Sequence, residues 1–212
     1  MPFSWCDRRP DPGSCRVGLM ADSHGDSEAI TAAAAFLKAH GCRLLIHLGD
    51  ICDSADPFTV TSCVAAVRGA GILAVRGNND HALVADETVR LDPEPRAWLA
   101  GLPLRIDMPS AVFIHNRPNI RRLGKAALFG DLTDAEALSF LHACPRRILF
   151  RGHSHRPSIQ RIGPGGLTAA PLPGAPGVVV DGGAVITCGS LDRGTVLMWD
   201  TVGQRVTLVE RD

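Results

Sequence analysis

The sequence predicts an α/β fold built on a parallel sheet, and three observations support that prediction. Short apolar runs alternate with helical patterns through the first half of the chain. Polar residues follow each apolar run directly, and the final third holds short apolar runs separated by turn residues. Apolar strands that alternate with helices are typical of parallel strands joined by right-handed crossovers. With 212 residues, 45% hydrophobic and 21% charged, the chain can form one domain with a core and is too apolar for general disorder.

The first eighty residues predict three strands and two helices. The strands cover residues 16–21, 44–48 and 72–75. The first helix, over residues 28–40, begins after Asp26, whose side chain can cap a helix N-terminus, and ends at Gly41. The second helix, over residues 57–68, has Pro57 in its first position, where proline is well tolerated.

The second half begins with the same alternation and then becomes all-β. A strand over residues 111–115 precedes a helix that starts at a capping box formed by Thr133 and Glu136. The strands predicted after this helix cover residues 147–151, 158–162, 177–180, 184–187, 195–199 and 205–209. The segment 163–177 is rich in glycine and proline, which favours a flexible hairpin tip. No repeat or linker divides the chain, so we expect one domain over residues 15–212 after a flexible extension, residues 1–14.

Charge and hydropathy exclude several classes of partner. The 22 Lys and Arg balance 22 Asp and Glu, whereas strong nucleic-acid binders are usually far more basic. No stretch approaches the ~18 apolar residues of a membrane span, and residues 1–14 hold no apolar run typical of a signal peptide. We therefore expect a cytoplasmic protein with seven reduced cysteines and no membrane or strong nucleic-acid partner. A homo-oligomer is compatible with the sequence.

Acids, imidazoles and an amide follow the predicted strands at the points where the strands end. They are Asp22, His24, Asp50, Asn78, His115, His153 and His155. Parallel strands gather such residues along one sheet edge, which is where open α/β sheets bind ligands. This mixture of oxygen and nitrogen donors suits two divalent transition-metal ions better than Mg²⁺ or Ca²⁺. Two-metal sites serve in-line displacement at phosphorus.

The series D-x-H, G-D, G-N-x-D, H and G-H-x-H, in this order, resembles the signature of the calcineurin-like metallophosphoesterases from about Val17 to Ser190. The resemblance implies a β-sandwich flanked by helices on its outer faces. It places around one metal ion Asp22, His24, Asp50 and His155, and around the other Asp50, Asn78, His115 and His153. It also implies that a metal-bridging hydroxide hydrolyses phosphodiester or phosphomonoester bonds of a small molecule. Mn²⁺ is the favoured metal, and Fe, Ni²⁺, Co²⁺ and Zn²⁺ are compatible.

The chain departs from the family pattern at two positions. Where many members have histidine in G-N-H-D, this chain has Asn79. The small bacterial and archaeal phosphodiesterase branch also lacks that histidine, so this departure favours that branch. The turn Thr187-Cys-Gly-Ser190 resembles that branch too, which favours a phosphodiesterase over a protein phosphatase. Asparagine can donate a hydrogen bond to a phosphoryl oxygen but supplies no proton at neutral pH. We therefore hypothesise either a preference for esters with good leaving groups or protonation of the leaving group by water. Second, Asn116 and Arg117 follow His115 where the family often has His-Gly, which changes the loop beside this ligand.

The remaining predicted site residues are assigned by their position near these motifs. Asn79 and Asp80 are assigned to catalysis, with Asp80 orienting the turn or a ligand, and Arg117 and Asn79 to substrate binding. Other arginines that could clamp a phosphodiester are Arg76, Arg121, Arg122 and Arg156. His47 is interpreted as a core histidine.

Rival mechanisms lack their motifs, because the chain has no P-loop, no cysteine-phosphatase loop and no G-x-S-x-G. The alternative from another class is a non-catalytic metal-binding scaffold of the same fold that serves protein assembly. The complete set of ligand residues favours the enzyme.

Overall fold

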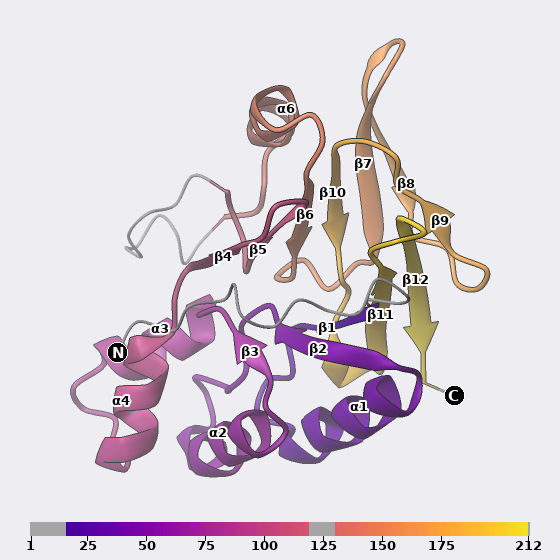
Figure 1. The fold of residues 1–212 in the computed structure, drawn as a ribbon. Coiled ribbons are helices and arrows are strands. Elements are labelled where there is room, and N and C mark those ends of the chain that lie inside the picture. The colour runs from indigo at the N-terminus through magenta and orange to yellow at the C-terminus, as the bar shows by residue number, and fades with distance from the viewer. Residues whose placement is uncertain (1–15, 119–129, 212) are drawn as a thin grey trace.

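The structure is a computed structural model that describes residues 16–118 and 130–211 (Figure 1). Within these ranges the strands form two six-stranded sheets, with helices on their outer faces. The first sheet has the order β3-β2-β1-β11-β12-β9 and consists of β1 (Arg16–Met20), β2 (Cys42–His47), β3 (Leu73–Ala74), β9 (Val178–Val179), β11 (Thr195–Asp200) and β12 (Arg205–Glu210). The second has the order β4-β5-β6-β10-β7-β8 and consists of β4 (Arg105–Asp107), β5 (Ala111–Ile114), β6 (Ile148–Arg151), β7 (Ser158–Gly163), β8 (Gly166–Pro171) and β10 (Ala184–Thr187). The predicted α/β sandwich with outer helices is confirmed.

Parallel pairing is confined to three strands in each sheet. In the first sheet β1, β2 and β3 run parallel, and in the second β5, β6 and β10 do. The other strand pairs are antiparallel, so both sheets are mixed. All of these parallel strands except β10 precede predicted site residues. Their carboxyl ends meet at one edge of the sandwich.

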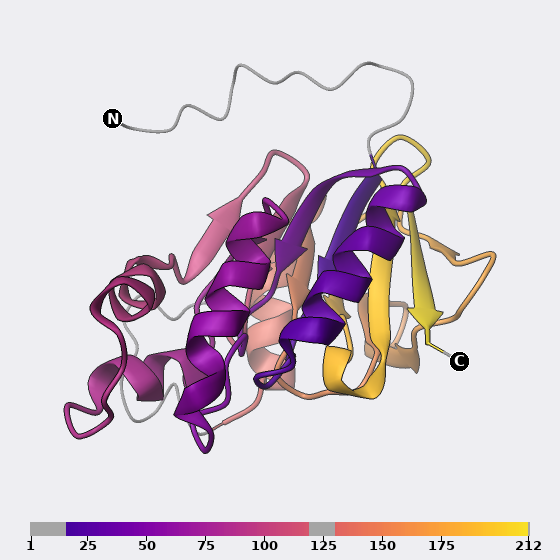
Figure 2. The same cartoon turned by 90° about the horizontal axis from the view of Figure 1, so that it is seen from below.

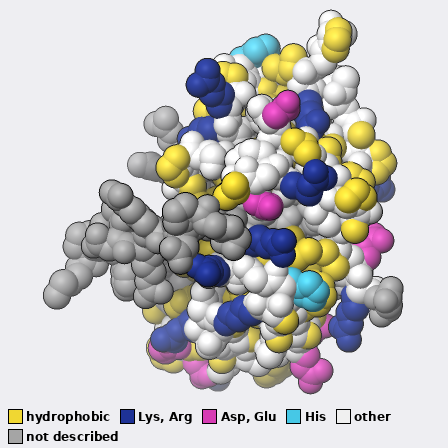
Figure 3. All heavy atoms as spheres, turned by 45° about the vertical axis from the view of Figure 1, so that its right-hand side comes forward, with side chains coloured by type: hydrophobic (Ala, Val, Ile, Leu, Met, Phe, Trp, Pro, Cys, Tyr) yellow, Lys and Arg dark blue, Asp and Glu magenta, His cyan; other side chains and the backbone are white. Residues whose placement is uncertain are grey.

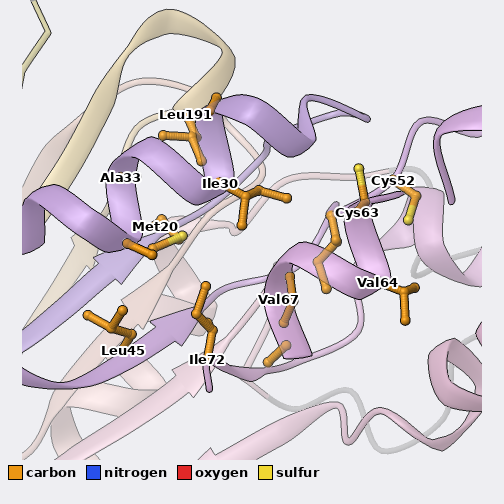
Figure 4. Close-up of a cluster of buried hydrophobic side chains, with 14 of the residues drawn as sticks. Met20, Ile30, Ala33, Leu45, Cys52, Cys63, Val64, Val67, Ile72 and Leu191 are labelled. Carbon is orange, nitrogen blue, oxygen red and sulfur yellow. The ribbon is translucent and has the colours of Figure 1, made fainter. Parts of the chain in front are cut away.

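After the exposed Arg16, the strand β1 is buried on both faces, which explains its apolar sequence from Val17 to Met20. Val17 and Leu19 pack in the core between the sheets, while Met20 points to the opposite side. There it joins a core under the helices α1 (Ser27–Ala39) and α2 (Val60–Gly69). Figure 4 shows Met20 in this cluster with side chains from both helices, and Figure 2 shows α1 and α2 lying across the first sheet.

Aromatic rings join the two sheets. The rings of Phe113 and Phe150 stack with centroids 5.5 Å apart, and the ring of Trp199 from the first sheet lies 5.1 Å from that of Phe150. Each of these side chains is at most 1% exposed. On the outer face of the second sheet, α6 (Asp134–Ala143) packs over a smaller apolar cluster. This packing fixes the positions of the strand ends of one sheet relative to those of the other.

The helix starts predicted from capping residues are confirmed. Asp26 Oδ1 accepts a hydrogen bond from the backbone N of Ala29 at 2.7 Å. Thr133 Oγ1 accepts from the backbone N of Glu136 at 3.3 Å, and Glu136 Oε2 accepts from that of Thr133 at 3.1 Å. Proline at position 57 opens a short 3₁₀ turn, η2 (Pro57–Thr59), which leads into α2.

Some described elements between the predicted strands were not expected, among them α3 (Asn78–Ala85), α4 (Pro93–Gly101) and the edge strand β4. In α3 the apolar residues form no clear stripe, because it buries only Asp80 and Leu83. Its start also lacks a capping side chain at Gly77, so neither periodicity nor a cap indicated a helix.

The prediction for segment 163–177 was wrong over its first half. The strands β7 and β8 pair from Ser158 opposite Pro171 to Gly163 opposite Gly166, so the hairpin tip is only Gly163–Gly166. Most side chains of β8 are exposed. Its pairing depends on backbone hydrogen bonds, and its sequence therefore lacks the apolar alternation of a half-buried strand.

The described residues also bear on the predictions about membrane helices, surface charge and cysteines. No described helix is long and apolar enough to cross a membrane. On the face shown in Figure 3, basic, acidic and apolar side chains are interspersed. The described cysteines are free thiols: Cys42, Cys52, Cys63, Cys144 and Cys188.

Candidate metal centre

The seven predicted ligand residues lie together at the strand-end edge of the sandwich. Backbone hydrogen bonds tie their loops to one another: Asp22 N donates to Gly49 O at 3.0 Å, and His24 N donates to Asp50 O at 3.1 Å. From the second sheet, Gly152 N donates to His115 O at 3.0 Å. Residues that are up to 133 positions apart in the sequence thus share one rigid framework.

One group of side chains that could hold a metal ion combines Asp22, His24 and His155, whose potential ligand atoms lie within 4.8 Å of one another. The Nε2 atoms of the two imidazoles are 3.1 Å apart, and His155 Nε2 lies 3.5 Å from Asp22 Oδ1. Asp22 is fully buried, and its carboxylate accepts a hydrogen bond from the backbone N of His153 at 2.9 Å. The hydrogen bond to Asp22 raises the pKa of His155.

A second group combines Asp50, His115 and His153. Asn78 belongs with it, because Asn78 Oδ1 lies 2.9 Å from both His115 Nε2 and His153 Nδ1. His115 Nε2 lies 3.4 Å from Asp50 Oδ2. Four donor atoms from four different loops therefore converge, which suits a cation.

The surroundings of His115 require positive charge at its Nε2 atom. Its Nδ1 lies 2.8 Å from Leu48 O, which can only accept, so Nδ1 carries the proton of the neutral ring. Nε2 then presents a lone pair to the oxygens of Asn78 and Asp50, an arrangement that needs either a second proton or a metal ion. Burial lowers the pKa of His115, but the charge and hydrogen bond of Asp50, the charge of Asp22 and the hydrogen bond to Leu48 O together outweigh burial and raise the pKa to about 9. A histidine that donates its other nitrogen to a backbone carbonyl is typical of metal sites.

Most of the predicted ligands have left-handed backbone conformations. The φ angles are 54° at Asp22, 43° at His24, 54° at Asp50, 74° at His153 and 57° at His155. Residues other than glycine seldom adopt positive φ, although Asp and His do so more often than most. Such conformations cluster at functional sites, where the surrounding structure enforces them.

Two glycines let the backbone approach the carboxylates closely. A Cβ at Gly77 would overlap the carboxylate and the backbone N of Asp50. A Cβ at Gly152 would lie 2.7 Å from Asp22 Oδ2 and 2.8 Å from Ala21 Cβ. No side chain fits at either position without moving the loop that carries an acid.

Asp80 is buried and binds the backbone of two loops. Its Oδ1 accepts hydrogen bonds from Ile51 N and Cys52 N, both at 3.0 Å, and its Oδ2 accepts from Gly77 N at 2.9 Å. Burial, followed by the nearby charge of Asp50, raises the pKa of Asp80 to about 6. Its side chain therefore joins the loop after β2 to the loop after β3.

Asn79, at the position where many family members have histidine, holds the carboxylate of Asp50. Its backbone N donates to Asp50 Oδ1 at 2.8 Å and its Nδ2 donates to Asp50 Oδ2 at 2.7 Å. With these bonds and the nearby imidazole of His115, Asp50 has a lowered pKa despite its burial.

The predicted arginines differ in their surroundings. Arg117 is bound to Glu136, with Nε 2.8 Å and Nη2 2.6 Å from Glu136 Oε1. Arg76 has a buried Nε atom without a hydrogen-bond partner among the described residues, and Arg156 is exposed. Arg121 and Arg122 lie outside the described residues.

Supporting residues around the site were less visible in the sequence. His47 is buried as predicted: its Nδ1 accepts from Gly49 N at 3.2 Å, its Nε2 contacts Ser23 Oγ at 3.0 Å, and burial lowers its pKa to about 4. Arg151, which is 4% exposed, donates from Nε to Asn116 O at 3.0 Å and thus ties the segment after His115 to β6. An arginine within an apolar strand was a signal for this role, because a buried charge needs partners.

Comparisons with known proteins agree with the fold and the motifs. The family model described as the calcineurin-like phosphoesterase superfamily domain matches residues 15–203. An uncharacterized protein of Methanocaldococcus jannaschii is 25% identical over 165 residues, which are 68% of this chain and 64% of that relative. The match thus spans less than two thirds of the relative's length.

Two solved structures share the fold. The metallophosphoesterase from Sphaerobacter thermophilus superposes with a TM-score of 0.75 at 21% identity, covering 94% of this chain and 89% of that one. An archaeal phosphodiesterase superposes with a TM-score of 0.52 at 18% identity, covering 92% and 99%. Because the family model spans nearly the whole chain and the motifs lie in its order, the chain belongs to the calcineurin-like phosphoesterase superfamily.

Proposed function

We propose that the protein is a binuclear metal-dependent phosphoesterase that prefers phosphodiesters of small molecules to phosphoproteins. The observation that carries the proposal is the convergence of two donor groups, with His115 Nε2 facing the oxygens of Asn78 and Asp50. That arrangement is satisfied by a cation. Carboxylate, amide and imidazole donors together favour transition metals, and we propose Mn²⁺, with Fe, Ni²⁺, Co²⁺ and Zn²⁺ as compatible ions.

Asp50 is proposed as the ligand that both metal ions share. One ion would also be held by Asp22, His24 and His155, and the other by Asn78, His115 and His153. The bound ions would supply Lewis acidity to the phosphoryl oxygens and a lowered pKa for a water between them. Leu48 O keeps the His115 ring in the tautomer whose Nε2 lone pair faces the site.

Arg117 and Asn79 are proposed to bind the substrate's phosphoryl group. Arg117 lies two residues after His115, and its guanidinium would exchange the carboxylate of Glu136 for a phosphoryl oxygen. The backbone of Asn79 is held by Asp50, which keeps this residue beside the proposed shared ligand. Asp80 acts on the reaction only by holding the two loops together.

Turnover of bis(4-nitrophenyl) phosphate tests the proposed function. We expect activity that requires added Mn²⁺, is lost with EDTA and returns when Mn²⁺ is restored in excess. No turnover of any diester or monoester at any metal loading, with partner binding that ignores EDTA, would instead favour the non-catalytic scaffold.

The side chain at position 79 predicts how the rate depends on the leaving group. Because Asn79 supplies no proton, an Asn79→His variant is expected to gain most on esters with poor leaving groups, by up to about 10²-fold if the histidine acts as a general acid. The measurement is kcat across aryl phosphodiesters of increasing leaving-group pKa. An equal change across that series would contradict this role for the residue.

A further inference from the structure

We propose that Ser54 is a positioning residue that acts through Asn79 to fix the carboxylate of Asp50. The inference rests on the proposed function, because Asp50 matters most there as the ligand shared by two metal ions. Ser54 belongs to none of the family motifs found in the sequence.

The first step is the contact between Asn79 and Asp50. Asn79 donates to both carboxylate oxygens, from its backbone N at 2.8 Å and from its Nδ2 at 2.7 Å. Two donors from one residue fix the plane of the carboxylate as well as its position. Each oxygen still has a lone pair free for a metal ion, because a carboxylate offers about four acceptor sites.

The second step is the orientation of the Asn79 amide, which Ser54 determines. The Asn79 Oδ1 atom lies 2.5 Å from Ser54 Oγ and 3.4 Å from Ser54 N. A backbone N–H can only donate, so the atom that faces it must be the amide oxygen, and Nδ2 must face Asp50. The opposite orientation would set the amide oxygen against the carboxylate and the NH₂ group against the N–H of Ser54.

The third step is the rigidity of the loop that carries Ser54. Asp53 Oδ1 accepts a hydrogen bond from Ala55 N at 2.8 Å, and Asp53 O accepts one from Asp56 N at 3.2 Å. At the start of this loop, Cys52 N is bound to Asp80. Although Ser54 is exposed, its backbone is therefore held on both sides beside Asn79.

The expected consequence is a pre-organised ligand. Without the Ser54 hydroxyl, the Asn79 oxygen keeps only the longer 3.4 Å contact with the Ser54 N–H and loses the 2.5 Å one. The amide is then held less firmly, and so is the bond from its Nδ2 to Asp50 Oδ2. Partners of metal ligands typically contribute 10–100-fold to metal affinity or activity. Ser54 acts one residue further from the metal and is exposed, so we expect about 3- to 30-fold.

Calorimetric titration of the full-length, metal-free protein with Mn²⁺ tests the proposal without relying on turnover. Ser54→Ala is expected to weaken Mn²⁺ binding by the factor above, and Ser54→Thr, which keeps the hydroxyl, to bind within about 2-fold of wild type. Ser62→Ala is the matched control, because the Ser62 hydroxyl is also exposed and donates to Thr59 O at 2.9 Å. It is expected to bind like wild type.

An Asn79→Ala background separates a relay from a direct effect. Adding Ser54→Ala there is expected to change Mn²⁺ affinity no further, because the intermediate side chain is gone. An unchanged affinity in the Ser54→Ala single variant, or the same loss in both backgrounds, would overturn the proposal while leaving the proposed function intact. A wild-type protein that binds none of the proposed ions (Mn²⁺, Fe, Ni²⁺, Co²⁺ and Zn²⁺) would overturn both.

Discussion

Asp50→Asn is expected to lower kcat/KM for bis(4-nitrophenyl) phosphate by more than about 100-fold. Loss of a residue that only supports a metal ligand costs up to about 100-fold, and loss of the ligand itself should cost more. An amide has a single acceptor oxygen and no charge, so it cannot serve as the shared ligand of two cations. The fold should survive, because Asp50 has φ 54° and asparagine tolerates the left-handed region. Metal analysis is expected to show fewer than two Mn²⁺ per chain.

The matched control is Asp53→Asn, three residues along the same loop. Asp53 Oδ1 accepts from Ala55 N, and the asparagine oxygen can do the same, so turnover should stay near the wild-type value. If Asp50→Asn kept more than about a tenth of wild-type kcat/KM with two Mn²⁺ bound, Asp50 would not be the shared ligand; the expected loss is far larger.

Gly77→Ala is expected to weaken both Mn²⁺ binding and the fold. The new Cβ would overlap the carboxylate and the backbone N of Asp50, and a backbone atom cannot yield as the end of a long side chain can. The loop after β2 must therefore move. We expect more than 10-fold weaker Mn²⁺ binding and a free energy of unfolding lower by about 1–3 kcal/mol, as in other overpacked sites. Calorimetry and urea unfolding measure the two effects.

Gly69→Ala provides the control for this substitution. A Cβ at Gly69, in the last turn of α2, would have no neighbour within 4 Å. It should leave Mn²⁺ affinity unchanged and raise the free energy of unfolding by up to about 1 kcal/mol, because alanine favours helix more than glycine does. Equal stability of the two variants would show that the loop after β2 has room for a side chain.

The sequence was most informative where one physical constraint acts on consecutive residues. The strand β1 is apolar after Arg16 because both of its faces are buried there, and α1 begins where Asp26 caps it. By contrast, α3 has no apolar stripe and β8 is mostly exposed. Their conformations depend on Asp80 and on pairing with β7, which are contacts in space that local patterns do not encode.

In the candidate site, too, some residues could be predicted from the sequence and others could not. Acids and imidazoles at strand ends could be found because a parallel sheet gathers strand ends wherever they lie in the sequence. Ser54 could not, because it is an exposed loop serine whose relation to Asn79 spans 25 positions. The pairing of Arg117 with Glu136 was equally hidden, since both residues fit an ordinary solvated surface.

The positive φ angles at Asp22, His24, Asp50, His153 and His155 imply a trade-off between activity and robustness. For residues other than glycine the left-handed region is disfavoured by roughly 1–2 kcal/mol each, somewhat less for aspartate. A glycine in place of His24 would therefore relax the backbone while deleting a donor. Selection for thermal resistance alone would favour glycine at these positions, so the side chains present here cost stability in exchange for donor atoms at this edge of the sandwich.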